Sequence, residues 1–431
     1  MKSATRRGLR VRVGSAAVSA LVAVGVGFAP GATAADVQSE QWYLAPMKAE
    51  EMWKVTTGEG VKVAVIDSGV NPNTASLKGQ VLVDEVPKEV AHGATDDYEG
   101  HGTSMAELIA GTGAGGGIKG LAPGAKIVPY RLALSGLSDA KEKELAPTSQ
   151  EAVRAAADSD AQIISMSFGG EAYEAEMEEA VKYAASKGKL LIASVGNRGL
   201  DDGFIGLPAA YHYVLGVSSI DEKSHISDFA SSGQYVDLVA PGEDMPGYCK
   251  PNFKDYCHDL SGTSASAAIA SGAAALIWSA HPDWTANQVT RALIDTAGRT
   301  WPKDEPTKNA GYGTIRPRSV LLNPDYDPGP PYSDPLGKEN KEKGGQLVTE
   351  IPPASASASA KPSAGATAAS QGAEGSSADK QAAAGSDDAK AASADAADDS
   401  SSTLWITLGA AAAVVVIGGV AFAVLRARRA N

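Results

Sequence analysis

The sequence predicts a single α/β domain of three layers, in which a mostly parallel sheet carries helices on both of its faces. Two observations predict this class. Short runs of β-branched and apolar residues alternate along the chain with longer segments of helical pattern, as in repeated strand–helix units. The expected strands are also apolar at nearly every position, which is typical of strands buried on both faces of a parallel sheet.

The order of these elements follows from local signals. Thr148-Ser149-Gln150-Glu151 has the pattern of a capping box, and Gly188 follows a helical segment as a C-terminal stop. Asp67 and Asn197 directly follow strands, at the end where active groups gather in parallel sheets. We expect strands at 61–66, 126–131, 161–167, 190–195, 213–218 and 236–239, and helices that start at 105 and 149 and at 173–187, 265–279 and 286–296.

The N-terminus has the features of a secretory signal peptide over residues 1–34. A basic start with four arginines precedes the apolar stretch 13–28, and Ala32-Thr33-Ala34 fits the small-residue cleavage pattern. An uncleaved membrane anchor is the alternative. After cleavage, residues 35–59 would form an N-terminal extension of the folded domain, which we place at 60–322.

The C-terminal part predicts a membrane anchor. Leu404 to Leu425 carries no charge and is long enough to cross a bilayer, so we expect a transmembrane helix at 403–425. Arginines follow in 426–431, which the positive-inside rule assigns to a cytoplasmic tail. The preceding 323–402 is first Pro-rich and then rich in Ala, Ser and Asp, a composition typical of a disordered stalk. We therefore expect a single-pass type I protein of the cell membrane with an extracellular domain.

The net charge and the cysteine content limit which ligands and binding partners the chain can have. The formal net charge of −13 argues against a nucleic-acid partner. Cys249 and Cys257 are the only cysteines, and an extracellular location favours a disulfide between them. A metal pair is the alternative, although no cluster of His and Cys with ligand spacing accompanies them. We predict no metal and no cofactor.

Three motifs indicate a serine protease that acts on peptide or protein substrates. Asp67 lies in V-A-V-I-D-S-G, His101 in G-H-G-T-S-M-A and Ser264 in S-G-T-S-A-S-A-A, each in a Gly-flanked turn beside an apolar segment. A Ser hydroxyl becomes a nucleophile when an imidazole takes its proton and a buried carboxylate orients that imidazole. A helix cap is the alternative for Gly-Thr-Ser, but all three motifs occur in the order Asp, His, Ser, and we predict a catalytic triad.

Asn197 is the candidate for the oxyanion hole. It ends a strand in a Gly turn, and its amide could donate to the developing oxyanion together with the Ser264 backbone N–H. Ordinary turn chemistry is the alternative for an Asn after Gly. Its position between His101 and Ser264 favours the catalytic interpretation.

With these residues in line, the chain resembles the subtilisin-like serine peptidases, or subtilases, over roughly residues 60–297. The resemblance implies a subtilisin-like fold, endopeptidase activity through an acyl-enzyme, and a substrate that pairs as an added strand. It implies that Ser165, Ser167, Phe168, Gly169 and Gly170 bind this substrate. One departure is Ala265-Ser266-Ala267-Ala268, which has no proline where the family has one to fix the helix start.

The layout further resembles the mycosins, membrane-anchored subtilases of actinobacterial type VII secretion systems. This resemblance implies a role in processing substrates of such a system or in supporting it, with the secretion membrane complex as a partner. The alternative is a scaffold subunit whose catalysis is dispensable. The charged insertion at 137–148 has no role predicted from the sequence, and we expect it to be a solvated loop.

Overall fold

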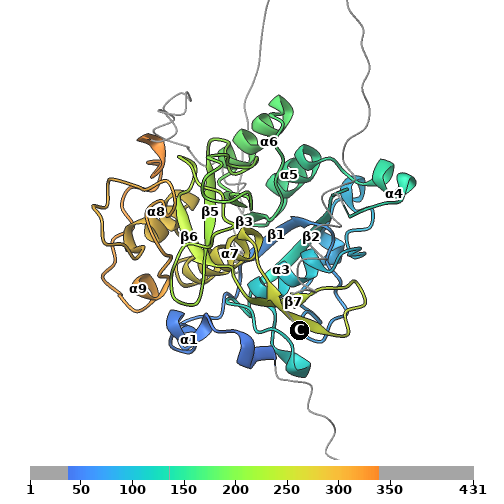
Figure 1. The fold of residues 1–431 in the computed structure, drawn as a ribbon, viewed down its shortest axis with the longest axis horizontal. Coiled ribbons are helices and arrows are strands. Elements are labelled where there is room, and N and C mark those ends of the chain that lie inside the picture. Colours follow the sequence, from blue (N-terminus) through green and yellow to red (C-terminus); the bar gives the residue numbers. More distant parts are fainter. Residues whose placement is uncertain (1–36, 135, 339–431) are drawn as a thin grey trace, which may run out of the picture. The chain divides into compact units, whose positions relative to one another are not determined.

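At the centre of the fold lies a parallel sheet of six strands in the order β2-β1-β3-β4-β5-β6 (Figure 1). The structure is a computed structural model that describes residues 37–134 and 136–338. The chain pairs β1 first with β2 and then, on its other side, with β3, so the order reverses there, which is where α/β sheets place their sites. The strands are β1 (Lys62–Asp67), β2 (Lys126–Arg131), β3 (Ile163–Met166), β4 (Leu190–Ser194), β5 (Val214–Ile220) and β6 (Leu238–Pro241).

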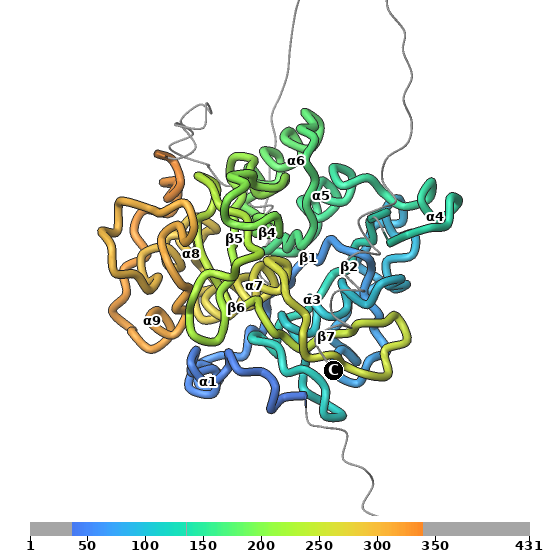
Figure 2. Tube along the Cα trace, in the orientation of Figure 1, coloured from blue at the N-terminus to red at the C-terminus, as the bar shows by residue number. Residues whose placement is uncertain are grey.

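Helices cover both faces of this sheet, as the tube in Figure 2 also shows. On one face lie α3 (His101–Ala110), α7 (Thr263–Ala280) and α8 (Ala286–Thr296), and on the other α5 (Ser149–Asp158) and α6 (Ala175–Ser186). Strand β1 shows why both faces need cover. Val63 and Val65 belong to the core under α3 and α7, whereas Ala64 and Ile66 belong to the core under α5 and α6. The predicted three-layer α/β class is confirmed.

The smaller elements lie around this framework. Two short strands form an antiparallel hairpin, β7 (Met245–Tyr248) and β8 (Tyr256–Leu260). The short α-helices are α1 (Leu44–Met47), α2 (Ala49–Met52), α4 (Ala140–Leu145) and α9 (Arg318–Leu321), and the 3-10 helices are η1 (Val37–Glu40), η2 (Val83–Glu85), η3 (Lys88–Val90) and η4 (Ala114–Gly116).

The structure differs from the sequence-based expectations at several places. Helix α3 begins at His101 rather than at 105, so His101 lies in its first turn. The β7–β8 hairpin was not predicted, since its residues lack a clear alternation. Helix α7 begins at Thr263 rather than at 265, so Ser264 lies inside its first turn. The insertion at 137–148 contains the helix α4, capped by Asp139, whose side chain accepts from the Glu142 N–H.

Residues 37–59 pack closely on the rest of the domain. Gln41 exchanges two hydrogen bonds with the backbone of Lys119, of 2.7 and 2.8 Å, and the Trp53 indole donates to the Leu121 carbonyl at 2.8 Å. Tyr43 is completely buried in the core beside α3 and α7. This part of the predicted extension is therefore built into the domain.

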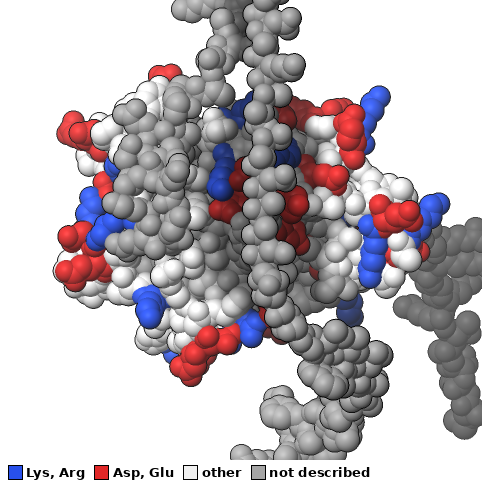
Figure 3. Space-filling model, turned by 90° about the horizontal axis from the view of Figure 1, so that it is seen from above, with Lys and Arg blue, Asp and Glu red and all other residues white. Residues whose placement is uncertain are grey.

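The remaining predicted segments lie outside the described residues: the signal peptide at 1–34, the transmembrane helix at 403–425, the tail at 426–431 and most of the stalk at 323–402. Within the described part, α7 alone is long and apolar enough to cross a membrane, but it is 83% buried inside the domain and serves as a core helix. On the face seen in Figure 3, acidic and basic side chains lie interspersed.

Candidate active site

Strand β1 and helix α3 bring Asp67 and His101 together. Asp67 is the last residue of β1 and is fully buried, and His101 is the first residue of α3. The His101 Nδ1 lies 2.7 Å from the Asp67 Oδ1. With the Nδ1 proton donated to the carboxylate, the Nε2 of the neutral ring is left to accept a proton from a nucleophile.

The acidic surroundings of His101 change its titration. Burial alone would lower the pKa of His101, but the charge and hydrogen bond of Asp67, followed by the charges of Asp97 and Glu99, outweigh burial and raise it to about 9. The ring therefore holds its proton more firmly than an isolated imidazole. It can act as a base only as the pH rises towards this value.

Asp97 is a second buried carboxylate near His101, and the sequence analysis did not single it out. Its Oδ1 accepts from the Gly100 N–H at 2.8 Å, and its Oδ2 accepts from the Thr103 N–H at 2.9 Å and from the Thr103 hydroxyl at 2.6 Å. These bonds cap the start of α3. The available signal was an acidic residue shortly before a Gly and an apolar helix.

Ser264 lies in the first turn of α7, across from β3. Its hydroxyl donates to the Ser167 carbonyl at 3.1 Å, and the Ser167 hydroxyl donates to the Ser264 carbonyl, also at 3.1 Å. Among the described residues, no hydrogen bond joins Ser264 to His101. The structure thus pairs Ser264 with Ser167, one of the predicted substrate-binding residues.

Asn197 is held so that its amide nitrogen is available. Its Oδ1 accepts from both the backbone N–H and the hydroxyl of Thr263, each at 3.0 Å. Asn197, Ser167 and Ser264 line one cavity of about 300 Å³. With the oxygen engaged, the Nδ2 group and the backbone at the start of α7 are the donors that remain for an anion beside Ser264.

The predicted substrate-binding residues divide into two groups. Phe168, Gly169 and Gly170 line the cavity that contains Ser264 and also a neighbouring one of about 450 Å³. Ser165 differs, because its side chain is 1% exposed and its hydroxyl accepts from that of Ser271 in α7. Ser165 therefore faces the core beneath the site rather than the groove.

The insertion at 137–148 forms one wall of the larger cavity, opposite Phe168 to Gly170. Its helix α4 is tied to the sheet by Glu142, which pairs with the fully buried Arg131 at 2.5 Å and with His92 at 3.0 Å. The segment contains a helix where a loop was expected, whereas its expected exposure is confirmed, since Lys141, Lys143 and Glu144 are exposed. The pairing was invisible in the sequence because Arg131 ends a strand that reads as apolar.

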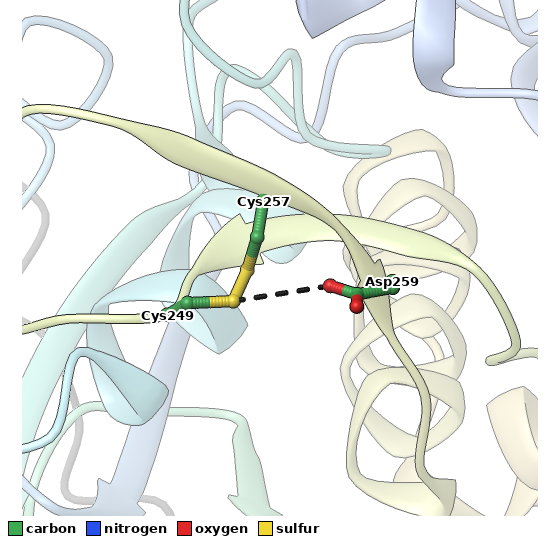
Figure 4. A group of neighbouring side chains, drawn as sticks. All are labelled: Cys249, Cys257 and Asp259. Atoms are coloured by element: carbon green, nitrogen blue, oxygen red, sulfur yellow. Dashed lines mark hydrogen bonds between the residues drawn. A yellow bond between two sulfur atoms is a disulfide. The ribbon is translucent and has the colours of Figure 1, made fainter. Parts of the chain in front are cut away.

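Cys249 and Cys257 are joined by a disulfide, with their Cα atoms 5.8 Å apart, and a carboxylate oxygen of Asp259 lies 4.0 Å from the Cys249 sulfur (Figure 4). These three side chains would be close enough to hold a metal ion. Thiolates are the ligands that such a site requires, and the disulfide uses both sulfur atoms.

Comparisons with known proteins agree with this geometry. The sequence profile of the subtilase family matches residues 58–314. The chain is 35% identical over 281 residues to the major intracellular serine protease of Bacillus subtilis (strain 168), covering 62% of this chain and 85% of that protein.

Solved structures of mycosins are also similar to it. MycP1 from Mycobacterium smegmatis matches with 27% identity and a TM-score of 0.54, over 67% of this chain and 86% of that one. A second MycP1 structure, described as an essential component of the type VII (ESX-1) secretion system, matches with 27% identity and a TM-score of 0.55, over 67% and 90%.

Proposed function

The chain belongs to the subtilase family of serine endopeptidases and is similar in structure to the mycosins, and we propose that Asp67, His101 and Ser264 are its catalytic triad, with Asn197 in the oxyanion hole. The observation that carries the proposal is the 2.7 Å contact between His101 Nδ1 and a fully buried Asp67, on an imidazole whose other nitrogen is free to serve a nucleophile.

The proposed reaction proceeds in two halves. The Ser264 hydroxyl leaves the Ser167 carbonyl, passes its proton to His101 Nε2 and attacks the scissile carbonyl carbon. The oxyanion accepts hydrogen bonds from Asn197 Nδ2 and from the backbone at the start of α7. His101 then gives its proton to the leaving amine, and water hydrolyses the acyl-enzyme with His101 again as base.

A fluorophosphonate probe tests this assignment, because it reacts with an activated serine and not with an ordinary one. The full-length chain should be labelled at Ser264, as mapped by mass spectrometry, and Ser264→Ala should abolish the labelling. The matched control is Ser266→Ala, two residues along the same helix, which should leave labelling in place. Labelling of another serine would overturn the assignment.

The biological setting that we propose is a membrane-anchored, extracellular peptidase that works with a type VII secretion system. Support comes from the similarity to MycP1, an essential component of such a system, and from the uncharged run Leu404 to Leu425 with arginines after it. The small Cys249–Cys257 disulfide fits an oxidising compartment. The natural substrate would be a protein that this system secretes.

A scaffold role is the second candidate, favoured by the way residues 37–59 are built into the domain. Complementation separates the two roles. In a strain that lacks this protein, the Ser264→Ala chain should fail to restore secretion if the peptidase role is the essential one. Restored secretion of substrates that stay unprocessed would instead favour the scaffold.

A further inference from the structure

We propose that the β7–β8 hairpin, residues 245–260, positions His101, and that the Cys249–Cys257 disulfide holds the hairpin in the arrangement that does so. The hairpin lies against α3, the helix that starts at His101 (Figure 1). The inference rests on the proposed function, since it requires His101 to be the catalytic base. It adds a redox dependence of the peptidase rate.

The hairpin makes close contacts with the first turn of α3 and with the residue that precedes it. The Tyr248 N–H donates to the Ser104 hydroxyl at 2.7 Å, and that hydroxyl donates to the Gly100 carbonyl at 2.6 Å. Gly100, which precedes His101 and has a φ of +85°, lies so close that a Cβ added to it would be 3.0 Å from the Tyr248 Cβ and 3.3 Å from the Lys250 carbonyl oxygen. A displacement of the hairpin would therefore move the backbone next to His101.

A buried carboxyl group anchors the hairpin further along α3. Glu107 is completely buried and accepts from the Thr74 hydroxyl at 2.7 Å and from the Tyr256 hydroxyl at 2.7 Å, while the Tyr248 hydroxyl donates to that of Tyr256 at 2.8 Å. A carboxyl group in such a site is costly unless it is hydrogen-bonded. The two tyrosines of the hairpin therefore supply bonds that α3 needs.

The disulfide closes the hairpin directly beside these tyrosines. Cys249 follows Tyr248, and Cys257 follows Tyr256. An isolated two-stranded hairpin is only marginally stable, and a crosslink reduces the freedom that it would otherwise gain. Without the crosslink, we expect Tyr248 and Tyr256 to lose their fixed places against α3.

The disulfide is open to chemical reduction because Cys249 is exposed. Dithiothreitol would transfer two electrons and two protons to Cys249 and Cys257, giving two thiols, and would itself be oxidised to its cyclic disulfide.

The experiment compares the oxidised full-length chain, the same chain treated with dithiothreitol, and the double variant Cys249→Ser/Cys257→Ser. Each is tested for kcat and KM on a short peptide amide and for fluorophosphonate labelling. We expect kcat to fall about ten- to a hundredfold with KM nearly unchanged, because a misplaced base slows chemistry more than binding. Reoxidation should restore the rate of the treated protein, and the exposed variant Lys254→Ala should match the wild type.

A second pair of variants tests the anchor and keeps the outcome clear if the cysteine variant does not fold. Glu107→Ala should lower kcat in the same way, whereas Glu107→Gln, which keeps an acceptor and the side-chain shape, should recover most of it. Circular dichroism verifies that each protein is folded. An equal kcat in the oxidised and reduced folded protein overturns the proposal, while absence of labelling in the oxidised wild type overturns the proposed function instead.

Discussion

Asp67 and His101 form one half of the site, which is held by charge and burial, whereas Ser264 and Asn197 form the other half, which is held by neutral hydrogen bonds at the start of a helix. In the first half, Asp67 and Asp97 are buried carboxylates within reach of one imidazole. In the second, Asn197 is exposed to the cavity, and both it and Ser264 are oriented by contacts with neutral partners.

Because of this difference, we expect changes in the charged half to affect the pH dependence of the peptidase activity and changes in the neutral half to affect its rate. Changes in the charged half should move the pH at which the peptidase becomes active, because they alter the pKa of His101. Changes in the neutral half should lower the rate by a constant factor at every pH, because they alter only the fit to the oxyanion.

The largest expected effect tests whether the two halves act as one unit. Ser264→Ala should lower kcat about 10⁶-fold, a magnitude taken over from subtilisin, and adding His101→Ala should cost little more. The physical reason is that the imidazole has no role without the hydroxyl it activates. Steady-state kinetics on a peptide amide provide the measurement, and multiplied losses in the double variant would show that the halves work independently.

Asn197→Ala should lower kcat about 10²- to 10³-fold, again the size found in subtilisin, with KM nearly unchanged. Because no titrating group is altered, the pH profile should keep its shape. A loss below tenfold would remove Asn197 from the oxyanion hole. Thr263→Val is the companion variant, since it removes one of the two bonds that hold the Asn197 oxygen and should give a smaller loss of the same kind.

Glu107→Gln should change how the stability of the fold depends on pH. Burial raises the pKa of Glu107 to about 7, and the hydrogen bonds from Thr74, Tyr256 and Tyr248 only partly oppose this. The unfolded chain ionises near 4.5, so the protonated Glu107 contributes stability that is complete below that pH and is lost as the pH rises through 7.

The expected loss is on the order of 3 kcal/mol across this window. Thermal unfolding from pH 4 to 8 measures this loss of stability in the wild type. The Glu107→Gln protein has no carboxyl group at this position and should not show the loss. An identical pH dependence of the wild type and Glu107→Gln would contradict the raised pKa.

Glu99→Gln should give the smallest effect, confined to the charged half. Its carboxylate is one of the charges that raise the pKa of His101, so the neutral amide should let the imidazole lose its proton at lower pH. The acidic limb of kcat/KM should move to lower pH, while the maximal rate should change less than tenfold. Asp255→Asn, on the hairpin turn, is a control of equal charge change and should leave the limb in place.

Local patterns in the sequence were enough to predict the sheet, most helices and the positions of Asp67, His101 and Asn197 relative to them. Strand β1 is predicted by its consecutive apolar residues, and the start of helix α5 is predicted by the four residues of its capping box. The order of the three motifs also needed nothing beyond the chain itself. The subtilase assignment made from those motifs is confirmed.

Only the tertiary structure decided the partners of the buried polar groups. Arg131 and Glu142, Glu107 and Tyr256, and Asp97 and Ser68 are contacts between residues far apart in the sequence. A charged or hydroxyl side chain looks like surface in a local pattern, because its burial depends on whether a distant segment supplies a hydrogen bond. The sequence by itself therefore determined which groups we propose for the chemistry, whereas the packed fold decided which groups hold them in place.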